Sequence, residues 1–106
     1  MEHLQQQGYT IIARNYRCRL GEIDIIAEED GVLCFVEVRS VATRTFGDPL
    51  ETIDGAKQRR ILKTAQHYLA ARRVGHRQIR FDVVGIVQQP RLQIQLVRRA
   101  FEDRGW

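Results

Sequence analysis

The chain has few cysteines, few prolines and no long apolar run, and each shortage excludes a class of protein. Its 106 residues include two cysteines and two prolines. Cys18 and Cys34 are too few for a disulfide scaffold, and they lack the spacing of a metal site. No stretch of about 18 apolar residues is present, which excludes a transmembrane helix. With no basic segment followed by an apolar one at the N-terminus, we expect a reduced, cytoplasmic protein.

The charged residues are unevenly distributed along the chain. Seventeen Lys and Arg against thirteen Asp and Glu give a net charge of +4. Six acids lie between residues 21 and 38, and eight bases with no acid lie between residues 55 and 81. An acidic set beside a basic stretch suits a site that binds a cation and a phosphate chain together. The alternative is a solvated helix face, which is the usual meaning of a charge run.

Length and periodicity predict one domain over residues 1–106 with an α/β fold. A short helix over 2–7 ends at Gly8, and a longer helix runs from Gly55 to Arg73. Asp54 is the expected N-cap of the longer helix, and Gly75 is its expected stop. Alternating or β-branched stretches predict five strands, and the connection over 42–54 is expected to be a loop. The predicted strands cover 9–16, 22–29, 32–41, 79–87 and 92–97.

The second and third strands are separated by Asp30 and Gly31, a strong signal for a two-residue hairpin turn. In the resulting register, paired residue numbers sum to 61. Strict alternation would then place Glu22, Asp24 and Ile26 on one face, with Ile23, Ile25 and Ala27 on the other. The same register predicts two facing pairs whose side chains share one face: Asp24 with Glu37, and Glu22 with Arg39.

Two carboxylates facing each other across a hairpin repel, so the pair Asp24 and Glu37 needs an explanation. A divalent cation provides one, because Mg²⁺ typically takes one or two carboxylates together with water and phosphate oxygens. The alternative is a set of edge-strand charges in solvent, with Glu22 and Arg39 as a surface pair. A slip of one residue would instead place Asp24 opposite Val36.

Three ordered motifs carry a resemblance to a known family. They are Gly-Glu-Ile-Asp-Ile-Ile-Ala at 21–27, Phe-Val-Glu-Val-Arg at 35–39 and Arg-Phe-Asp-Val-Val at 80–84. With these motifs the chain resembles the YraN family of bacterial proteins over nearly its whole length. That family is similar to the PD-(D/E)xK nucleases, which include restriction endonucleases and archaeal Holliday-junction resolvases. The resemblance implies a restriction-endonuclease-like mixed sheet of about five strands flanked by helices.

The resemblance also implies an activity, a cofactor and roles for individual residues. The implied activity is Mg²⁺- or Mn²⁺-dependent hydrolysis of phosphodiester bonds by an endonuclease. Asp24 and Glu37 match the metal-binding acids, and Arg39 matches the basic residue of the (D/E)xK element. The carbonyl of Val38 would be a further metal ligand. Glu22 would support these ligands or replace one of them.

Two departures from the superfamily pattern bear on activity. Arg39 stands where a lysine is usual, and an arginine stays protonated and makes a poor general base. This favours an alternative, a catalytically weak or inactive module that still binds nucleic acid. Relatives also carry a glutamate on a longer first helix, whereas this chain begins too late to hold it.

Further candidates lie on the long helix and the first strand. Gln58 would lie near the metal, although a border glutamine on a half-buried face is the other interpretation. Lys57 at the helix N-terminus is a candidate phosphate contact. Arg14, Arg17 and Arg19 precede the acidic strand and are candidate contacts to a nucleic-acid backbone. The helical wheel places three further bases on the opposite, solvent-facing side of the helix: Arg59, Arg60 and Lys63.

The expected partner is nucleic acid, with DNA favoured over RNA, and we expect no membrane association. The resemblance points to branched or single-stranded substrates and to a homodimer. A different hypothesis is a protein-interaction subunit in DNA processing that makes no nucleic-acid contact. Salt dependence separates these hypotheses, because binding through phosphates weakens steeply as salt rises.

Overall fold

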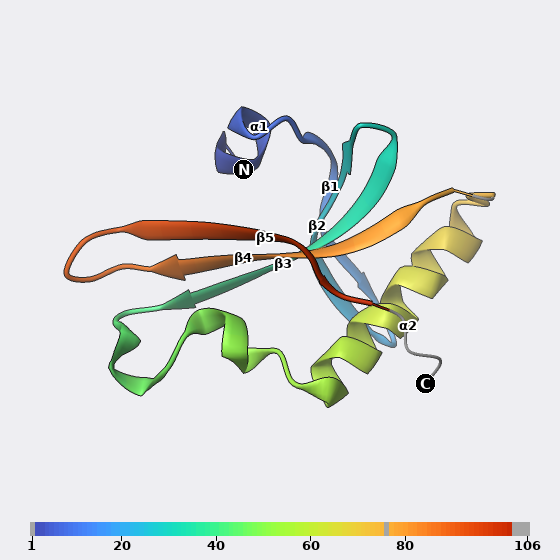
Figure 1. The fold of residues 1–106 in the computed structure, drawn as a ribbon. Helices are drawn as coiled ribbons and strands as arrows, with labels where there is room; N and C mark the ends of the chain where they lie inside the picture. The colour runs from blue at the N-terminus through green and yellow to red at the C-terminus, as the bar shows by residue number, and fades with distance from the viewer. Residues whose placement is uncertain (1, 76, 103–106) are drawn as a thin grey trace.

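A five-stranded mixed sheet forms the centre of the molecule in a computed structural model that describes residues 2–75 and 77–102 (Figure 1). The strands lie side by side in sequence order: β1 (Thr10–Cys18), β2 (Gly21–Glu29), β3 (Val32–Val41), β4 (Ile79–Val87) and β5 (Gln93–Phe101). Strands β3 and β4 are parallel, and the other neighbours are antiparallel. Because parallel neighbours need a crossover connection, helix α2 (Gly55–Ala71) joins β3 to β4 across one face. The α/β fold expected from the sequence is confirmed.

The helix ends follow backbone geometry that the sequence only partly signals. Helix α1 (Glu2–Gln6) ends at Gly8, whose φ of 100° lets the Tyr9 N–H donate to the Leu4 carbonyl at 3.0 Å. Asp54 caps α2 by accepting a hydrogen bond from the Lys57 N–H. The expected stop at Gly75 is wrong, since Arg73 takes the left-handed position with a φ of 53°.

The Asp30-Gly31 turn has the predicted geometry. Both residues have positive φ, 51° and 79°, which is the requirement of a type I′ turn. The ladder between β2 and β3 runs from the pair Glu29 and Val32 to the pair Ile25 and Val36. The paired numbers sum to 61, so the predicted register is confirmed over this stretch.

Two apolar cores lie on the two faces of the sheet. The core beneath α2 contains Leu33 and Phe35 of β3 together with Ile61, Leu62 and Ala65 of the helix. The core on the opposite face contains Cys34 and Val36, which are covered by Leu4 and Tyr9 near α1. The alternation of β3 therefore follows the sequence pattern, with one set of side chains in each core.

Strand β2 departs from the alternation that its sequence suggests. Ile25 and Ala27 lie in the core near α1, whereas Ile23 lies with Ile26 in the core beneath α2. The switch occurs at Asp24, opposite Asn15 of β1, which has a φ of 52°. A non-glycine residue with positive φ marks a local irregularity in the strand. Past this point toward the β1–β2 turn, the side chains that would have faced one side of the sheet face the other. The expectation that Ile23 shares a face with Ile25 is wrong for this reason.

The connection over 42–54 is more ordered than the predicted loop. It contains two short 3₁₀ helices, η1 (Arg44–Phe46) and η2 (Pro49–Thr52). Pro49 and Leu50 pack closely on Gly85 of β4, where an added Cβ would lie 3.1 Å from the Leu50 side chain. Strand β5 is also longer than predicted, since it continues to Phe101, which is buried beneath α2.

A network of charges that is buried except at Arg98 joins the N-terminal segment to the strands. Asp82 of β4 is fully buried and accepts hydrogen bonds from Tyr9 Oη at 2.6 Å and from Arg80 Nε at 2.8 Å. Arg80 also donates to Glu29 at 2.7 Å, and Arg98 of β5 donates to both oxygens of Glu29. Asp82 therefore has a structural role, because its carboxylate is fully used within the fold.

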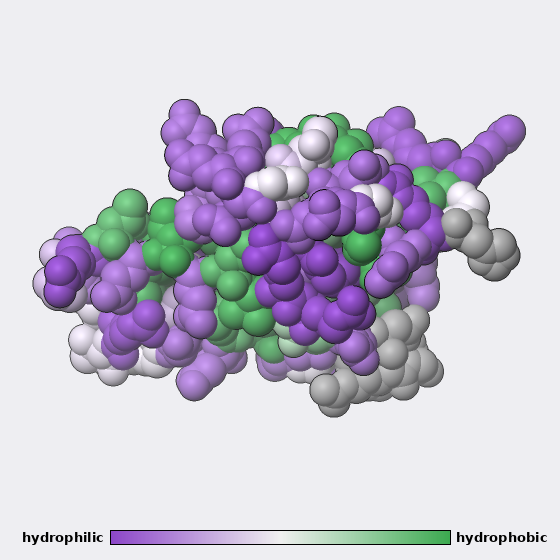
Figure 2. Space-filling model, turned by 45° about the horizontal axis from the view of Figure 1, so that its top comes forward, coloured by the Kyte–Doolittle hydropathy of each residue, from purple (hydrophilic) through white to green (hydrophobic). Residues whose placement is uncertain are grey.

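Helix α1 covers only one end of its face of the sheet. Figure 2 shows this side coming forward, with hydrophilic side chains over most of the visible surface. Some apolar side chains are visible toward the left of that view. Leu92, in the turn between β4 and β5, is 63% exposed. Within residues 2–75 and 77–102, neither α-helix is long and apolar enough to cross a bilayer.

Candidate functional site

The end of the β1–β2 hairpin bends toward helix α2 and packs against it. Gly21 approaches the helix so closely that an added Cβ would lie 2.8 Å from Thr64 Oγ1. Tyr16 Oη and His67 Nδ1 form a hydrogen bond of 2.6 Å, and the Tyr16 ring meets the edge of Tyr68 with centroids 5.1 Å apart. These contacts leave a recess between the hairpin, the helix and β3.

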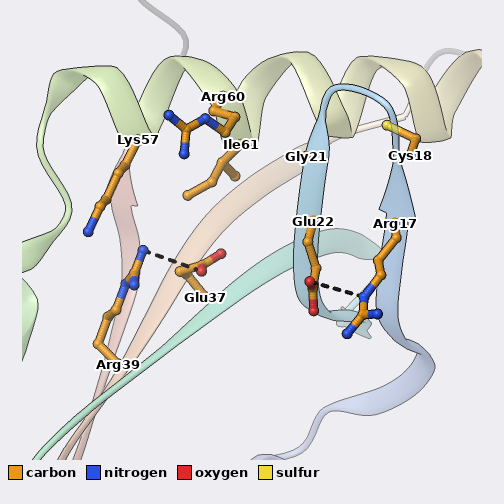
Figure 3. A pocket seen from close by; sticks show the side chains of 9 residues that line it. All are labelled: Arg17, Cys18, Gly21, Glu22, Glu37, Arg39, Lys57, Arg60 and Ile61. Atoms are coloured by element: carbon orange, nitrogen blue, oxygen red, sulfur yellow. Dashed lines mark hydrogen bonds and ion pairs between the residues drawn. The ribbon is translucent and has the colours of Figure 1, made fainter.

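The recess is a pocket of about 480 Å³ in which acidic and basic side chains face one another (Figure 3). Its lining comes from three elements: Arg17, Cys18, Gly21 and Glu22 of the hairpin, Glu37 and Arg39 of β3, and Lys57, Arg60 and Ile61 of α2. Four of the nine are cationic and two are carboxylates. The pocket can therefore hold a cation at its acids and an anion at its bases.

Glu37 and Arg39 form the side of the pocket contributed by β3. Their side chains are 12% and 28% exposed, and Arg39 Nη2 lies 3.6 Å from Glu37 Oε1. The second carboxylate oxygen, Oε2, and Arg39 Nε are both buried without a hydrogen-bond partner. An unpartnered buried oxygen costs free energy, so this carboxylate is incomplete as it stands.

Asp24 lies where strands β2 and β3 separate. The ladder ends at Ile25 and Val36, and beyond it Asp24 Oδ2 accepts a hydrogen bond from the Val38 N–H at 2.8 Å. The Asp24 side chain thus bonds to a backbone N–H of β3 just past the point where the backbone ladder between β2 and β3 ends. Val38 contributes its N–H to this contact, and the proposed use of its carbonyl as a metal ligand stays a prediction.

The environment of Glu37 raises its pKa from 4.5 to about 8. Burial is the main cause, because it disfavours the charged form, and the negative charge of Asp24 and a hydrogen bond with the Asp24 carboxylate add to it. The cation of Arg39 opposes the shift, while Glu22 reinforces it weakly. Glu37 in this pocket and Asp24 in the neighbouring smaller pocket are thus two carboxylates whose charges act on each other.

Glu22 does not join this pair as the predicted partner of Arg39. It lies across the pocket and binds Arg17 at 3.1 Å, while Arg39 pairs with Glu37 (Figure 3). In the part of the chain that the structure describes, no group of three or more Asp, Glu, His or Cys residues is placed to hold a metal. The acids at hand are the two carboxylates of Asp24 and Glu37, a number that suits Mg²⁺ with water and phosphate oxygens completing its shell.

The other predicted residues fall in different places. Lys57 and Arg17 line the pocket, as a phosphate contact would require. Arg14 lies beside Asp24 in a second, smaller pocket, and Arg19 is exposed in the turn of the hairpin. The Gln58 side chain donates to the Ile53 carbonyl at 3.3 Å and lines a different recess near Phe101.

Arg60 is exposed to solvent, as the sequence predicted, and it also lines the pocket. It lies one helical turn after Lys57 on α2, and both side chains reach toward Glu37 and Arg39 (Figure 3). Positions three apart on a helix share a face, so the spacing from Lys57 carried the missed signal. The apolar pattern of α2 marks only the buried face of the helix. It does not distinguish a residue that borders this face and lines a pocket from one that faces open solvent.

Known proteins resemble this chain over most of its length. The family described as uncharacterised protein family UPF0102 matches residues 1–86. A UPF0102 protein of Persephonella marina is 46% identical over 102 residues, covering 96% of this chain and 85% of that protein. One of Lachnoclostridium phytofermentans is 48% identical over 104 residues, covering 97% and 86%. Since the family and these relatives both match most of the sequence, the chain belongs to the UPF0102 family, the YraN family indicated by its motifs.

Proposed function

We propose that this protein is a metal-dependent endonuclease that hydrolyses phosphodiester bonds in DNA. One observation carries the proposal: Glu37 Oε2 is buried and receives no hydrogen bond from the fold, and it lies close to the like charge of Asp24 in a pocket whose other walls carry cations. A structural carboxylate would have found a donor in the fold, as Asp82 does. An orphaned acid next to a like charge is typical of a site that is completed by a ligand.

In this proposal the carboxylates bind the metal ion and the basic residues bind the substrate phosphate. Asp24 and Glu37 would hold Mg²⁺ or Mn²⁺, and Glu22, which lies across the pocket, would add negative charge near them. When bound, such an ion acidifies a water molecule and neutralises charge that develops on the phosphate. Lys57 and Arg60 face the carboxylates from α2 and provide cations for the phosphate oxygens.

Arg39 is the residue that decides how fast such a site would work. It is held 3.6 Å from Glu37 and keeps its proton, so it can stabilise charge on the phosphate but cannot take a proton from water. This observation favours a second candidate function, a nucleic-acid-binding module with weak or no cleavage. Binding would then depend on Lys57 and Arg60, whether or not a metal is present.

A cleavage assay on single-stranded, duplex and four-way-junction DNA with Mg²⁺ or Mn²⁺ tests the proposal. We expect the wild type to cut and both Asp24→Ala and Glu37→Ala to lose at least about 100-fold in rate, a loss typical of removing metal-directed charge stabilisation. Glu28→Ala is the matched control, because Glu28 lies on the same strand and pairs with Arg77 at the surface. Cleavage that survives both substitutions contradicts the proposal.

Arg39→Lys separates the two candidate functions. If Arg39 limits proton transfer, lysine raises the cleavage rate without changing the affinity for DNA. Binding by all variants with cleavage by none supports the binding module instead. A protein that binds no DNA at low salt contradicts both, since contacts through phosphates strengthen as salt falls.

A further inference from the structure

The sheet forks at Asp24, and the fork has a pocket on each side. The part of β2 before Asp24 runs with the β1–β2 hairpin toward α2. Strand β3 continues past Val36 away from that hairpin, toward η1 (Figure 1). The pocket with Glu37 lies on the α2 side. A second pocket of about 260 Å³ is lined by Arg14, Asn15, Asp24, Ile25 and Val38.

The second pocket opens on the opposite face of the sheet. Ile25 and Val38 belong to the core on the side away from α2, so their side chains point to that face. Asp24 lies between the two recesses, since it lines the second pocket while its charge acts on Glu37 in the first. Each pocket is therefore lined by one of the two candidate metal ligands.

The irregularity at Asn15 places a cation on each side of the fork. In a regular strand Arg14 and Tyr16 would share a face. The positive φ of Asn15 separates them, so Tyr16 packs beneath α2 while Arg14 is exposed beside the second pocket. Lys57 and Arg60 provide the cations on the other side. The order across the fork is thus cation, carboxylates, cation.

We propose that the substrate is a single nucleic-acid strand that crosses the fork from Arg14 to Lys57 and Arg60. This inference rests on the proposed function and names its substrate class. Successive phosphates on one flexible strand can meet cations on both sides while the intervening bond lies over Asp24 and Glu37. The pocket with Glu37 has the size of a site for a small molecule, which a nucleotide matches and a helix does not.

Stiffness excludes a continuous duplex from this path. Duplex DNA has a persistence length of about 50 nm, roughly ten times the 44 Å length of this molecule. It cannot turn from one face of the sheet to the other within the width of one strand pair. A single-stranded arm next to a duplex can do so, and this would give activity on branched DNA without recognition of the branch itself.

Fluorescence anisotropy with a labelled oligonucleotide tests the path without depending on cleavage. The full chain is titrated in Ca²⁺, which takes the same oxygen ligands as Mg²⁺, against a single strand and a blunt duplex of equal length. We expect the single strand to bind at least about tenfold more tightly, a difference of about 1.4 kcal/mol. Equal or tighter binding of the blunt duplex overturns the inference.

Variants locate the path on the protein. Arg14→Ala and Lys57→Ala should each weaken single-strand binding about threefold or more and lower the salt slope by about 0.7, the loss of one phosphate contact. Arg91→Ala is the matched control, because Arg91 is exposed in the β4–β5 turn and lines neither pocket. If Arg14→Ala behaves like Arg91→Ala, the proposed path is overturned.

The two proposals fail in different ways. Cleavage of blunt duplex that is lost in Asp24→Ala supports the endonuclease and overturns the single-strand path. Selective single-strand binding that depends on Arg14, with no cleavage of any DNA, supports the path and overturns the catalytic proposal.

Discussion

At the scale of single residues, Glu37 has an unusual environment for a carboxylate. Its side chain is 12% exposed, one oxygen has no partner and its pKa is raised to about 8. Burial and the neighbouring charge of Asp24 both favour the protonated form. The isolated protein thus keeps a proton at this position that a bound divalent cation would displace.

The raised pKa predicts a loss of stability as pH increases. Below about pH 4.5 Glu37 is protonated in the folded and unfolded chain alike and has no effect. Between about 4.5 and 8 the unfolded chain releases a proton that the folded chain retains, so the free energy of unfolding falls by at most about 1.4 kcal/mol per pH unit. Above about pH 8 the effect is complete. Urea denaturation in EDTA across this range measures it.

Glu37→Gln is the variant that isolates this effect. The free energy of unfolding of Glu37→Gln should increase relative to that of the wild type as pH rises from about 4.5 to 8, because glutamine does not titrate. A difference between the two proteins that does not change with pH would contradict the assignment. At about pH 8, Mg²⁺ should stabilise the wild type by mass action and leave Glu37→Gln unaffected.

At the scale of elements, the site depends on how the β1–β2 hairpin meets α2. The hairpin turns over at Asn15 and Asp24, and its end is held to the helix by Tyr16 and by the close approach of Gly21. Alternation in β2 could not reveal this turn, because the residues on both sides of Asp24 are isoleucines that suit either core. The pocket exists because the hairpin leaves the plane of the sheet.

Gly21→Ala tests the contact between the two elements. The new Cβ would lie 2.8 Å from Thr64 Oγ1 and 3.1 Å from Arg60 Cγ, and the φ of 154° disfavours any side chain. We expect a loss of about 1–3 kcal/mol in the free energy of unfolding, measured by urea denaturation, together with weaker DNA binding as the hairpin moves from Arg60. Gly75→Ala is the control, since no atom lies within 4 Å of its added Cβ, and it should change stability by less than about 0.5 kcal/mol.

At the scale of the whole molecule, the charge network on the α1 side joins segments that are far apart in sequence. Glu29 at the end of β2 binds Arg80 of β4 and Arg98 of β5, and Arg80 continues to Asp82 and Tyr9. Hydrogen bonds from Arg98 and Arg80 lower the pKa of Glu29 from 4.5 to about 2 against the opposing effect of burial. Two arginines and two carboxylates balance one another where a single charge would be costly.

Glu29→Gln should therefore destabilise the protein strongly near neutral pH. It leaves Arg80 and Arg98 without their shared carboxylate, and we expect a loss of about 3 kcal/mol or more. The loss should shrink as pH falls from about 4.5 to 2, because the folded wild type then protonates Glu29 and loses the same contribution. Urea denaturation at several pH values measures both variants.

Glu22→Gln is the control for that experiment. It removes an exposed carboxylate whose partner Arg17 is largely in solvent, so a change below about 1 kcal/mol is expected. A Glu29→Gln variant no less stable than Glu22→Gln would show that the network contributes little to the fold.

Local patterns in the sequence determined most of the elements and their pairing. The Asp30-Gly31 turn set the β2–β3 register, Asp54 set the start of α2, and alternation placed Glu37 with Phe35 on the face beneath the helix. These features follow from φ preferences, capping and side-chain period, all of which act over a few residues.

Only the tertiary structure decided how the hairpin, β3 and α2 meet. Arg60 lines the pocket, and Glu22 pairs with Arg17 instead of Arg39. Gln58 lines another recess. The left-handed residue after α2 is Arg73, whereas the sequence predicted a stop at Gly75. Each outcome depends on contacts between residues distant in sequence or on a φ that several residue types can adopt, and no local pattern records either. The sequence by itself therefore determined which residues carry the chemistry, and the packing of the hairpin against α2 decided which of them share a pocket.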